Sequence, residues 1–431
     1  MRRCIPAAAV LLALLVTFGC TKATGTAGFS WPQWRGPDGN GQSRETEWDP
    51  ASIAIERIAW TADIGMGYSN IAIQGGRLYA IGRTREGPKV SCLDAVTGKL
   101  RWDKIFTTSL PPQATPAVDG DLLFVLTNEG SLFAFDSRTG AQRWEKDLVG
   151  EYGIVKPYYG FGGSPMVYGD LLILNANTAG MALRRSTGEL VWVSEPPPAR
   201  ELQKTLGSDN GATYMTPVLC TLGGQRCALI YGWKGLSAVQ VQTGTALWTY
   251  EWRNYAGTMA ADPIVTGDRI LIADEVRSGI KDRQCTLVEI VNGAPKVRWE
   301  SSDLSSDVGT PLIAGGYIYN SHGGPYLTSP PPALRCLELE TGRLMWEERF
   351  TDTMGKWITL TMAGNNLIIL SERGTLRVAE ASSSGYREIF RSDMLKGAGQ
   401  RRLFPTPPVL CNAKIYCRSY AGDLVCIDVS N

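Results

Sequence analysis

The chain has 431 residues, with 43 lysines and arginines against 42 aspartates and glutamates, and its formal net charge is +1 at pH 7. This even balance leaves no long-range field that would attract a polyanion, so it argues against a nucleic-acid partner. Glycine (48 residues) and proline (24 residues) are both plentiful, which predicts a fold with many tight turns.

Residues 1–20 predict a signal peptide. Two arginines are followed by an apolar stretch of 14 residues, 5–18, which is shorter than the roughly 20 residues that a transmembrane helix needs. Gly19 and Cys20 then resemble the end of a bacterial lipobox, in which the cysteine is lipidated. We therefore expect an exported protein that is lipid-anchored through Cys20, with ordinary secretion as the alternative.

Residues 21–50 divide into a tether and a lead-in segment. Residues 21–30 are small and polar, as expected of a flexible tether. The Pro- and Gly-rich stretch 31–41 argues against regular structure, yet it carries Trp31 and Trp34. We expect this stretch to lie over the folded domain with its indoles packed into surface grooves. The alternative is a hook that binds a partner.

One repeat organises the remaining residues, 51–431. Thr-Gly, followed by Trp four residues after the glycine, occurs five times, and looser copies extend the pattern. Successive tryptophans lie 42 to 56 residues apart, which is the period of a four-stranded β-propeller blade. We expect seven of them to dock each blade onto the next: Trp60, Trp102, Trp144, Trp192, Trp248, Trp299 and Trp346.

Each repeat predicts four strands. A proline with a glycine four residues later, such as Pro116 and Gly120, marks the first hairpin, whose turn needs a positive φ. The predicted complete blades lie at about 67–105, 111–149, 160–196, 212–254, 258–301, 306–351 and 356–392.

The two ends of the repeat region complement each other. A final copy at 404–429 lacks its fourth strand, and residues 57–62 read as a fourth strand without the first three. Joining them closes an all-β ring of eight four-stranded antiparallel blades with no long exposed edge. We therefore predict an eight-bladed β-propeller in which an N-terminal strand completes the last blade.

Eight cysteines follow Cys20, and none has Cys-x-x-Cys spacing, so we predict no metal site. Cys220 and Cys227 flank Gly223-Gly224 symmetrically. A hairpin turning there would place the two thiols opposite each other. The pair forms either a disulfide or two buried thiols.

The repeats resemble the PQQ-like (quinoprotein) propeller repeat, Ala-x-Asp-x-x-Thr-Gly-x-x-x-Trp. Residues 134–144 match it throughout, and 92–102 match with Cys92 in place of Ala. The resemblance covers roughly residues 50–431 and implies one of two functional classes. One is the quinoprotein alcohol dehydrogenases, which bind pyrroloquinoline quinone (PQQ) and calcium in the central funnel. The other is non-catalytic scaffolds of the BamB type, outer-membrane lipoproteins that help to assemble β-barrel proteins.

The dehydrogenase class needs a quinone clamp and an ionised base. In that class a disulfide between adjacent cysteines covers the quinone, and this chain has no Cys-Cys. Four polar residues precede innermost strands at the expected channel mouth: Asp262, Asp307, Asn210 and Arg402. We expect them to cap strand ends or to solvate a loop, and we expect His322 to be an exposed loop residue. The sequence therefore predicts no catalytic residue.

The segments that lead into the innermost strands are rich in aromatic residues, which predicts a concave binding face. The candidates for this face are Tyr158, Tyr159, Phe161, Tyr214, Tyr255, Asp262, Trp357 and Arg402. The aromatic side chains could equally plug the channel.

We therefore expect a cofactor-free, non-catalytic binding or assembly scaffold of the bacterial cell envelope. The resemblance implies a periplasmic protein that is lipid-anchored to the outer membrane and binds a protein partner or a glycan. The alternatives are a PQQ- and calcium-dependent alcohol or sugar dehydrogenase and a carbohydrate-binding propeller.

Overall fold

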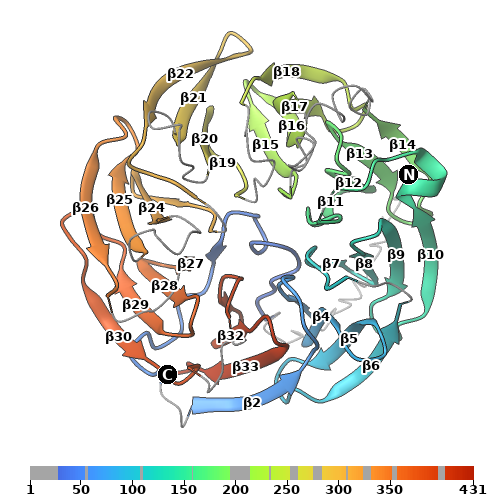
Figure 1. Cartoon of the computed structure of the whole chain (residues 1–431), viewed down its shortest axis with the longest axis horizontal. Helices are drawn as coiled ribbons and strands as arrows, with labels where there is room; N and C mark the ends of the chain where they lie inside the picture. The colour runs from blue at the N-terminus through green and yellow to red at the C-terminus, as the bar shows by residue number, and fades with distance from the viewer. Residues whose placement is uncertain are drawn as a thin grey trace, which may run out of the picture.

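The computed structural model describes residues 28–53, 57–106, 110–157, 159–194, 214–232, 234–252, 261–274, 284–306, 309–323, 332–351, 357–396 and 403–431. These residues form a ring of eight antiparallel four-stranded sheets, one of which carries an additional short parallel strand (Figure 1). The prediction of an all-β, eight-bladed propeller is confirmed.

Seven blades are continuous in sequence, and their strands follow from the axis outward. Blade 1 contains β3 (Ala72–Gln74), β4 (Arg77–Arg83), β5 (Pro88–Asp94) and β6 (Leu100–Ile105), and blade 2 contains β7 (Ala117–Asp119), β8 (Leu122–Leu126), β9 (Ser131–Asp136) and β10 (Gln142–Asp147). Blade 3 contains β11 (Met166–Tyr168), β12 (Leu171–Leu174), β13 (Met181–Arg184) and β14 (Leu190–Val193). Blade 4 contains β15 (Val218–Leu222), β16 (Gln225–Gly232), β17 (Gly235–Gln240) and β18 (Ala246–Tyr250).

Blade 5 contains β19 (Ile264–Thr266), β20 (Arg269–Ala273), β21 (Cys285–Val291) and β22 (Ala294–Ser301). Blade 6 contains β23 (Leu312–Ala314), β24 (Tyr317–His322), β25 (Ala333–Glu338) and β26 (Leu344–Arg349). Blade 7 contains β27 (Ile358–Ala363), β28 (Asn366–Ser371), β29 (Leu376–Glu380) and β30 (Glu388–Ser392). A short helix, α1 (Leu148–Tyr152), follows β10. No helix in the described ranges has the length and apolar character needed to cross a bilayer.

Blade 8 is formed by segments from both ends of the repeat region. Its inner strands are β31 (Val409–Leu410), β32 (Lys414–Arg418) and β33 (Asp423–Asp428), and its outermost strand is β2 (Ile58–Asp63). Trp60 lies opposite Cys426 and Ile58 lies opposite Ile427. The predicted closure of the ring by an N-terminal strand is therefore confirmed.

Tryptophans on the outermost strands contact the following blade. The indole N–H of Trp102 donates to the Ser137 carbonyl at 3.2 Å, and that of Trp144 donates to the Arg185 carbonyl at 2.9 Å. Five rings cover the glycine of the neighbouring Thr-Gly turn: those of Trp60, Trp102, Trp144, Trp192 and Trp299. At Gly140, where φ is +70°, an added Cβ would lie 2.7 Å from the Trp102 ring. Glycine thus serves both the turn and the approach of the indole.

Small residues lie beside these tryptophans. Cys92 pairs with Trp102, Ala134 with Trp144, and Cys336 with Trp346 across the third and fourth strands. These small side chains are fully buried. Because these side chains are small, the indole on the adjacent strand has room to reach the next blade.

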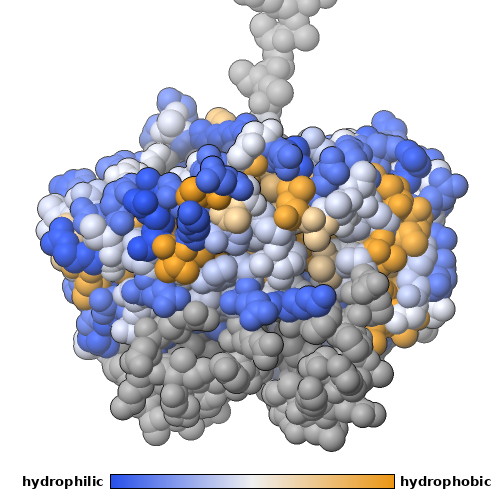
Figure 2. All heavy atoms as spheres, turned by 90° about the horizontal axis from the view of Figure 1, so that it is seen from above, coloured by the Kyte–Doolittle hydropathy of each residue, from blue (hydrophilic) through white to orange (hydrophobic). Residues whose placement is uncertain are grey.

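The propeller has two unlike faces. The hairpin face carries the first and last turns of each blade, such as Gly75-Gly76 and Thr97-Gly98 in blade 1. The loop face carries the middle turns and the segments that link successive blades. On the rim, isolated hydrophobic side chains alternate with charged ones, as the side view in Figure 2 shows.

Candidate functional site

The lead-in segment, residues 28–50, crosses the axis of the ring, where Figure 1 shows its blue trace, before Trp48 packs into the core of blades 7 and 8. It runs antiparallel to β3, with reciprocal backbone hydrogen bonds between Trp31 and Ile73 of 2.7 and 2.8 Å. It then turns and returns as β1 (Gln42–Ser43), which pairs in parallel with β27. The lead-in segment therefore enters from the hairpin face and forms a two-armed plug, deeper than the surface position expected for it.

The tip of the plug reaches the loop-face end of the channel. Arg35 has a φ of +60° and donates through one guanidinium nitrogen to the Asn40 carbonyl at 2.7 Å and the Pro311 carbonyl at 3.0 Å. Burial lowers the pKa of Arg35 to about 10, and the charge of Asp262 opposes that shift. Gly36 must be glycine because an added Cβ would lie 3.0 Å from the Trp31 ring at a φ of +83°.

A belt of hydrogen bonds surrounds this tip. Each residue that precedes an innermost strand of blades 1 to 5 donates its backbone N–H to the side chain of the equivalent residue in the next blade. The donor–acceptor distances are 2.8 to 3.3 Å. The members of the belt, in order, are Asn70, Thr115, Ser164, Thr216, Asp262 and Thr310. The belt satisfies backbone donors that have no strand partner at the crowded axis.

Asp262 joins the belt to the plug. Its Oδ1 accepts the Thr216 N–H at 2.8 Å, and its Oδ2 accepts the Trp34 indole N–H at 2.6 Å. Its side chain is buried, and burial raises the pKa of this carboxyl, an effect that the charge of Arg35 opposes. Asp262 is therefore a structural acceptor. Its assignment to an exposed binding face was wrong, because the plug covers it.

The channel between plug and belt is nearly full. Trp31, Trp34, Arg35 and belt residues line a remaining cavity of about 10 Å³, which is room for about one water molecule. The lead-in segment, and not the aromatic residues of the inter-blade loops, therefore fills this part of the channel.

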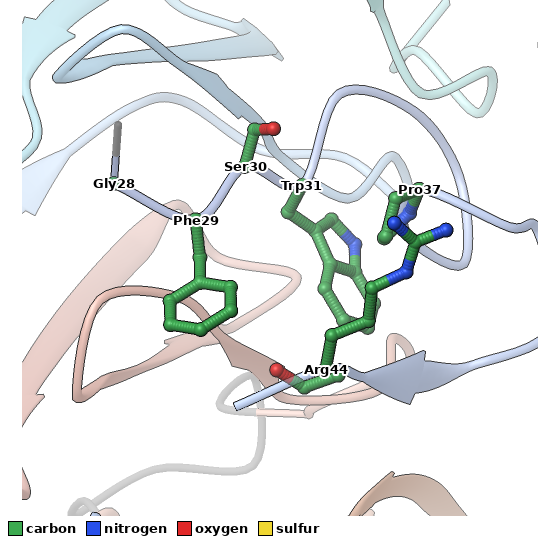
Figure 3. Close-up of a pocket in the computed structure, with 7 residues that line it drawn as sticks. Gly28, Phe29, Ser30, Trp31, Pro37 and Arg44 are labelled. Atoms are coloured by element: carbon green, nitrogen blue, oxygen red, sulfur yellow. The ribbon is translucent and has the colours of Figure 1, made fainter. Parts of the chain in front are cut away.

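The two arms of the plug enclose a pocket of about 230 Å³ on the hairpin face. Figure 3 shows Phe29 and Trp31 from the entering arm and Arg44 from the returning arm around it. Trp31 is buried, whereas Phe29 is 46% exposed and Arg44 forms an exposed ion pair with Asp38. This pocket exists only while the lead-in segment is docked.

The opposite mouth, on the loop face, carries a tyrosine cluster of four residues. Tyr159 and Tyr68 are 52% and 48% exposed. The Tyr68 and Tyr420 ring centroids lie 4.7 Å apart, and those of Tyr159 and Tyr214 lie 6.1 Å apart. Burial, with smaller contributions from Tyr420 and Tyr159, raises the pKa of Tyr68. The two pairs therefore share one surface.

Backbone and buried side chains hold this cluster in place. The Tyr214 hydroxyl accepts the Tyr159 N–H at 3.2 Å, and Gln113 donates to the Tyr159 carbonyl at 2.8 Å. Beneath Tyr68, the buried Arg418 donates to the Ser69 carbonyl at 2.5 Å. Loop tyrosines fixed in this way offer large amphipathic contact surfaces at small entropic cost.

The other predicted binding-face residues have different positions. Phe161 is buried in the core of blades 2 and 3, so its assignment to the exposed face was wrong. Trp357 is half-buried, and its indole donates to the Phe404 carbonyl at 3.2 Å. Six residues named from the sequence lie outside the described residues: Cys20, Tyr158, Asn210, Tyr255, Asp307 and Arg402.

The expectation that His322 is an exposed loop residue was also wrong. His322 ends β24, is half-buried, and shares a 3.2 Å hydrogen bond with the Ser305 hydroxyl. Burial, aided by the positive charge of Arg335, lowers its pKa to about 4. The imidazole is therefore neutral at neutral pH.

Cys220 and Cys227 lie directly opposite each other in the β15–β16 hairpin, as the sequence predicts. Both are free thiols in the structure, and their sulfur atoms are 3.4 Å apart. Hydrogen bonding with Cys227, together with burial, raises the pKa of the Cys220 thiol well above its usual range. Within the described ranges, no three His, Cys, Asp or Glu side chains gather closely enough to hold a metal ion.

Comparison with known proteins relates the chain to one family. The family model described as outer membrane protein assembly factor BamB matches residues 52–219 and 90–330. The protein of that name from Burkholderia pseudomallei is 24% identical over 75% of this chain and 78% of its own length. The protein of that name from Yersinia pestis is 24% identical over 67% of this chain and 65% of its own length.

Solved structures share the fold. BamB from Moraxella catarrhalis superposes with a TM-score of 0.57 at 17% identity, over 86% of this chain and 96% of that chain. A europium-containing methanol dehydrogenase superposes with a TM-score of 0.59 at 13% identity, over 92% of this chain and 90% of that chain. At these identities the superpositions establish the architecture alone, so function depends on the site.

Proposed function

Because the chain belongs to the family of the outer membrane protein assembly factor BamB, we propose that it is a non-catalytic scaffold for outer-membrane protein assembly in the periplasm. The relatives named above carry that function in their names. Docking on a protein partner requires a rigid, accessible surface rather than a reaction centre. The loop face supplies such a surface.

The observation that carries this proposal is the contrast between the two mouths of the channel. The lead-in segment fills the channel from the hairpin face, with space left for about one water molecule. At the loop-face mouth, Tyr68 and Tyr159 are about half exposed, and a hydrogen bond from Gln113 fixes the loop that carries Tyr159. Tyrosine is enriched at the energetic centres of protein interfaces. The tyrosine cluster is therefore our candidate docking surface.

The runner-up function, a PQQ- and calcium-dependent dehydrogenase, fits these residues poorly. The resemblance places the quinone in the central funnel, and here Trp34 and Arg35 occupy that level. The carboxylate present there, Asp262, already accepts two hydrogen bonds and faces the plug. Adding PQQ and calcium to the purified protein should give neither saturable binding nor dye reduction, and turnover would favour the dehydrogenase.

A lipid on Cys20 would orient the scaffold. Gly28 lies on the hairpin face, where an added Cβ would contact Asn412 in the first turn of blade 8. Seven residues separate it from Cys20, and the eight steps between their Cα atoms span at most about 28 Å. The hairpin face would then lie nearer the membrane, with the tyrosine cluster directed away. Metabolic labelling with palmitate should mark the wild-type protein and not Cys20→Ala.

The docking test uses the full-length protein in solubilised envelopes. Crosslinking followed by mass spectrometry should capture a subunit of the outer-membrane β-barrel assembly machinery. Tyr68→Ala and Tyr159→Ala together should reduce capture at least tenfold, because interface tyrosines each contribute about 1–3 kcal/mol. Phe29→Ala is the matched control, since Phe29 has a similar exposure of 46% but lies on the opposite face. Equal loss in the control, or full capture by the double variant, would refute the assignment of this surface.

A further inference from the structure

Blade 4 differs from blades 1, 2, 3, 5 and 6 in the length of its first hairpin. Its innermost strand β15 has five residues, whereas the innermost strands of blades 1, 2, 3, 5 and 6 have three. The hairpin turns at Gly223-Gly224, where both φ values are positive. The Gly223 N–H donates to Asp268 of blade 5 at 2.8 Å. The lengthened hairpin is therefore held in place on the hairpin face.

A groove of about 330 Å³ lies between this hairpin and blade 3. Its floor includes Val241, whose carbonyl accepts the Trp192 indole N–H at 2.8 Å, so blade docking fixes the floor. The main side chains that line it are Tyr168, Gln225, Arg226, Gln240, Gln242 and Leu247. The volume is near the lower end of the roughly 300–1,000 Å³ of ligand pockets.

The lining combines an aromatic ring, amides and one cation. The Arg226 guanidinium carbon lies 5.2 Å from the centre of the Tyr168 ring, a cation–π arrangement that steadies both groups. Arg226 forms no ion pair with a carboxylate of the described residues. None of the described residues that line the groove is acidic, and Arg226 gives this lining a positive charge.

These groups match a sugar that carries a carboxylate. Side-chain amides both donate and accept, as neighbouring hydroxyls require. The Tyr168 ring edge and Leu247, which is 37% exposed, offer apolar surface to the C–H face of a pyranose. Arg226, which forms no ion pair with a carboxylate of the described residues, can bind a ligand carboxylate through two parallel hydrogen bonds. We propose that this groove is a binding site for an acidic saccharide.

The site is independent of the tyrosine cluster, because it lies on the opposite face, and each can be tested without the other. The probes are trigalacturonic acid and its neutral methyl ester, titrated into the full-length protein by calorimetry. We expect saturable binding of the acid and at least tenfold weaker binding of the ester.

Variants distinguish specific binding in this groove from nonspecific electrostatic attraction of the anionic probe to the protein. Arg226→Gln and Tyr168→Ala should each weaken binding of the acid at least tenfold. Arg77→Gln is the matched control, since Arg77 begins the second strand of blade 1 on the same face, beside a first hairpin of ordinary length. Circular dichroism should show that all variants are folded. No saturable binding, equal binding of acid and ester, or equal loss in the control would overturn the proposal.

Cys220 and Cys227 support a second inference, which does not depend on the groove. Cys220 and Cys227 face each other across the same hairpin with sulfur atoms 3.4 Å apart, and the signal-like N-terminus predicts export to an oxidising compartment. We infer that the exported protein forms a Cys220–Cys227 disulfide. Each thiol loses one proton and one electron, and the two electrons reduce the disulfide of a periplasmic dithiol oxidoreductase to two thiols.

Thiol counting tests this inference. Protein isolated from the periplasm under acid-trapping conditions should have two fewer alkylated cysteines than the same protein after reduction, and peptide mapping should assign them to Cys220 and Cys227. Complete alkylation of both residues without reductant would overturn the inference. The Cys220→Ser variant should show no change on reduction.

Discussion

The plug inside the central channel and the loop-face mouth use polar and aromatic residues in opposite ways. Within the plug, Trp31 is buried and Trp34 donates its indole N–H to Asp262. At the loop-face mouth, the rings of Tyr68 and Tyr159 are about half exposed. What distinguishes the two regions is burial: the chain covers the plug, whereas Tyr68 and Tyr159 are accessible to a partner.

This difference separates residues that stabilise the propeller from residues that are available to a partner. Substitutions at the plug should change stability, and substitutions at the tyrosine cluster should change binding. Four variants, in order of decreasing expected effect, test this distinction.

The largest effect is expected for Asp262→Ala. The change leaves the Thr216 and Trp34 N–H groups without acceptors and the nearby Arg35 without a compensating charge. We expect a loss of about 3 kcal/mol in the free energy of unfolding, measured by chemical denaturation. Asp38→Ala in the same segment breaks only an exposed ion pair and should cost less than about 1 kcal/mol. Equal effects would mean that the plug adds little stability.

A smaller loss is expected for Gly140→Ala. The added methyl group would meet the Trp102 ring at 2.7 Å, at a φ of +70°. We expect a loss of about 2 kcal/mol in unfolding free energy. At Gly120 φ is +61° and an added Cβ meets nothing within 4 Å, so Gly120→Ala should show backbone strain alone, about 1 kcal/mol. If the two variants were equally stable, the indole contact would not hold the blades together.

Tyr159→Ala should reduce stability by less than about 1 kcal/mol, because the side chain is 52% exposed. Its unfolding midpoint in denaturant is the measurement. A large loss of stability would make Tyr159 part of the packing of the loop face, and the contrast between the two mouths would fail.

The smallest effect concerns the pH dependence of stability through His322. Its pKa is about 4 in the folded protein, against an ordinary value of 6.5. As the pH falls below 6.5, the unfolded chain takes up this proton first, so stability declines until about pH 4 and then levels off. Unfolding midpoints at pH 7.5 and pH 5 should therefore differ less in His322→Gln than in the wild type. An unchanged difference would show that His322 does not contribute.

The fold could be predicted because its determinants repeat. The Thr-Gly…Trp pattern marks the contact between neighbouring blades, and local spacing in one blade is supported by the same spacing in the others. Blade 8 was predictable for a related reason, since the strand missing from 404–429 has its equivalent at 57–62. Its pairing, with Trp60 opposite Cys426, is the arrangement seen within the continuous blades.

The site was less predictable because its residues meet across the axis rather than along the chain. Asp262 was named for its acidity, but nothing in its own repeat indicates that Trp34 donates to it. The belt did leave a signal, since a Ser, Thr or Asp directly precedes the prolines 116, 165, 217, 263 and 311. Tyr420 was not predicted because it lies in a middle turn of blade 8, outside the segments that lead into the innermost strands.

Blade 8 also restricts when the protein can fold. Its sheet needs β2 from the beginning of the chain and β33 from the end, which are separated by more than 350 residues. An emerging chain therefore remains an open array with an unpaired edge until its final strand arrives. Such a delay would suit a protein that is exported as proposed above, because a closed ring cannot pass a narrow translocation channel. The same pairing means that removal of β33 should leave β2 without a partner and the ring open.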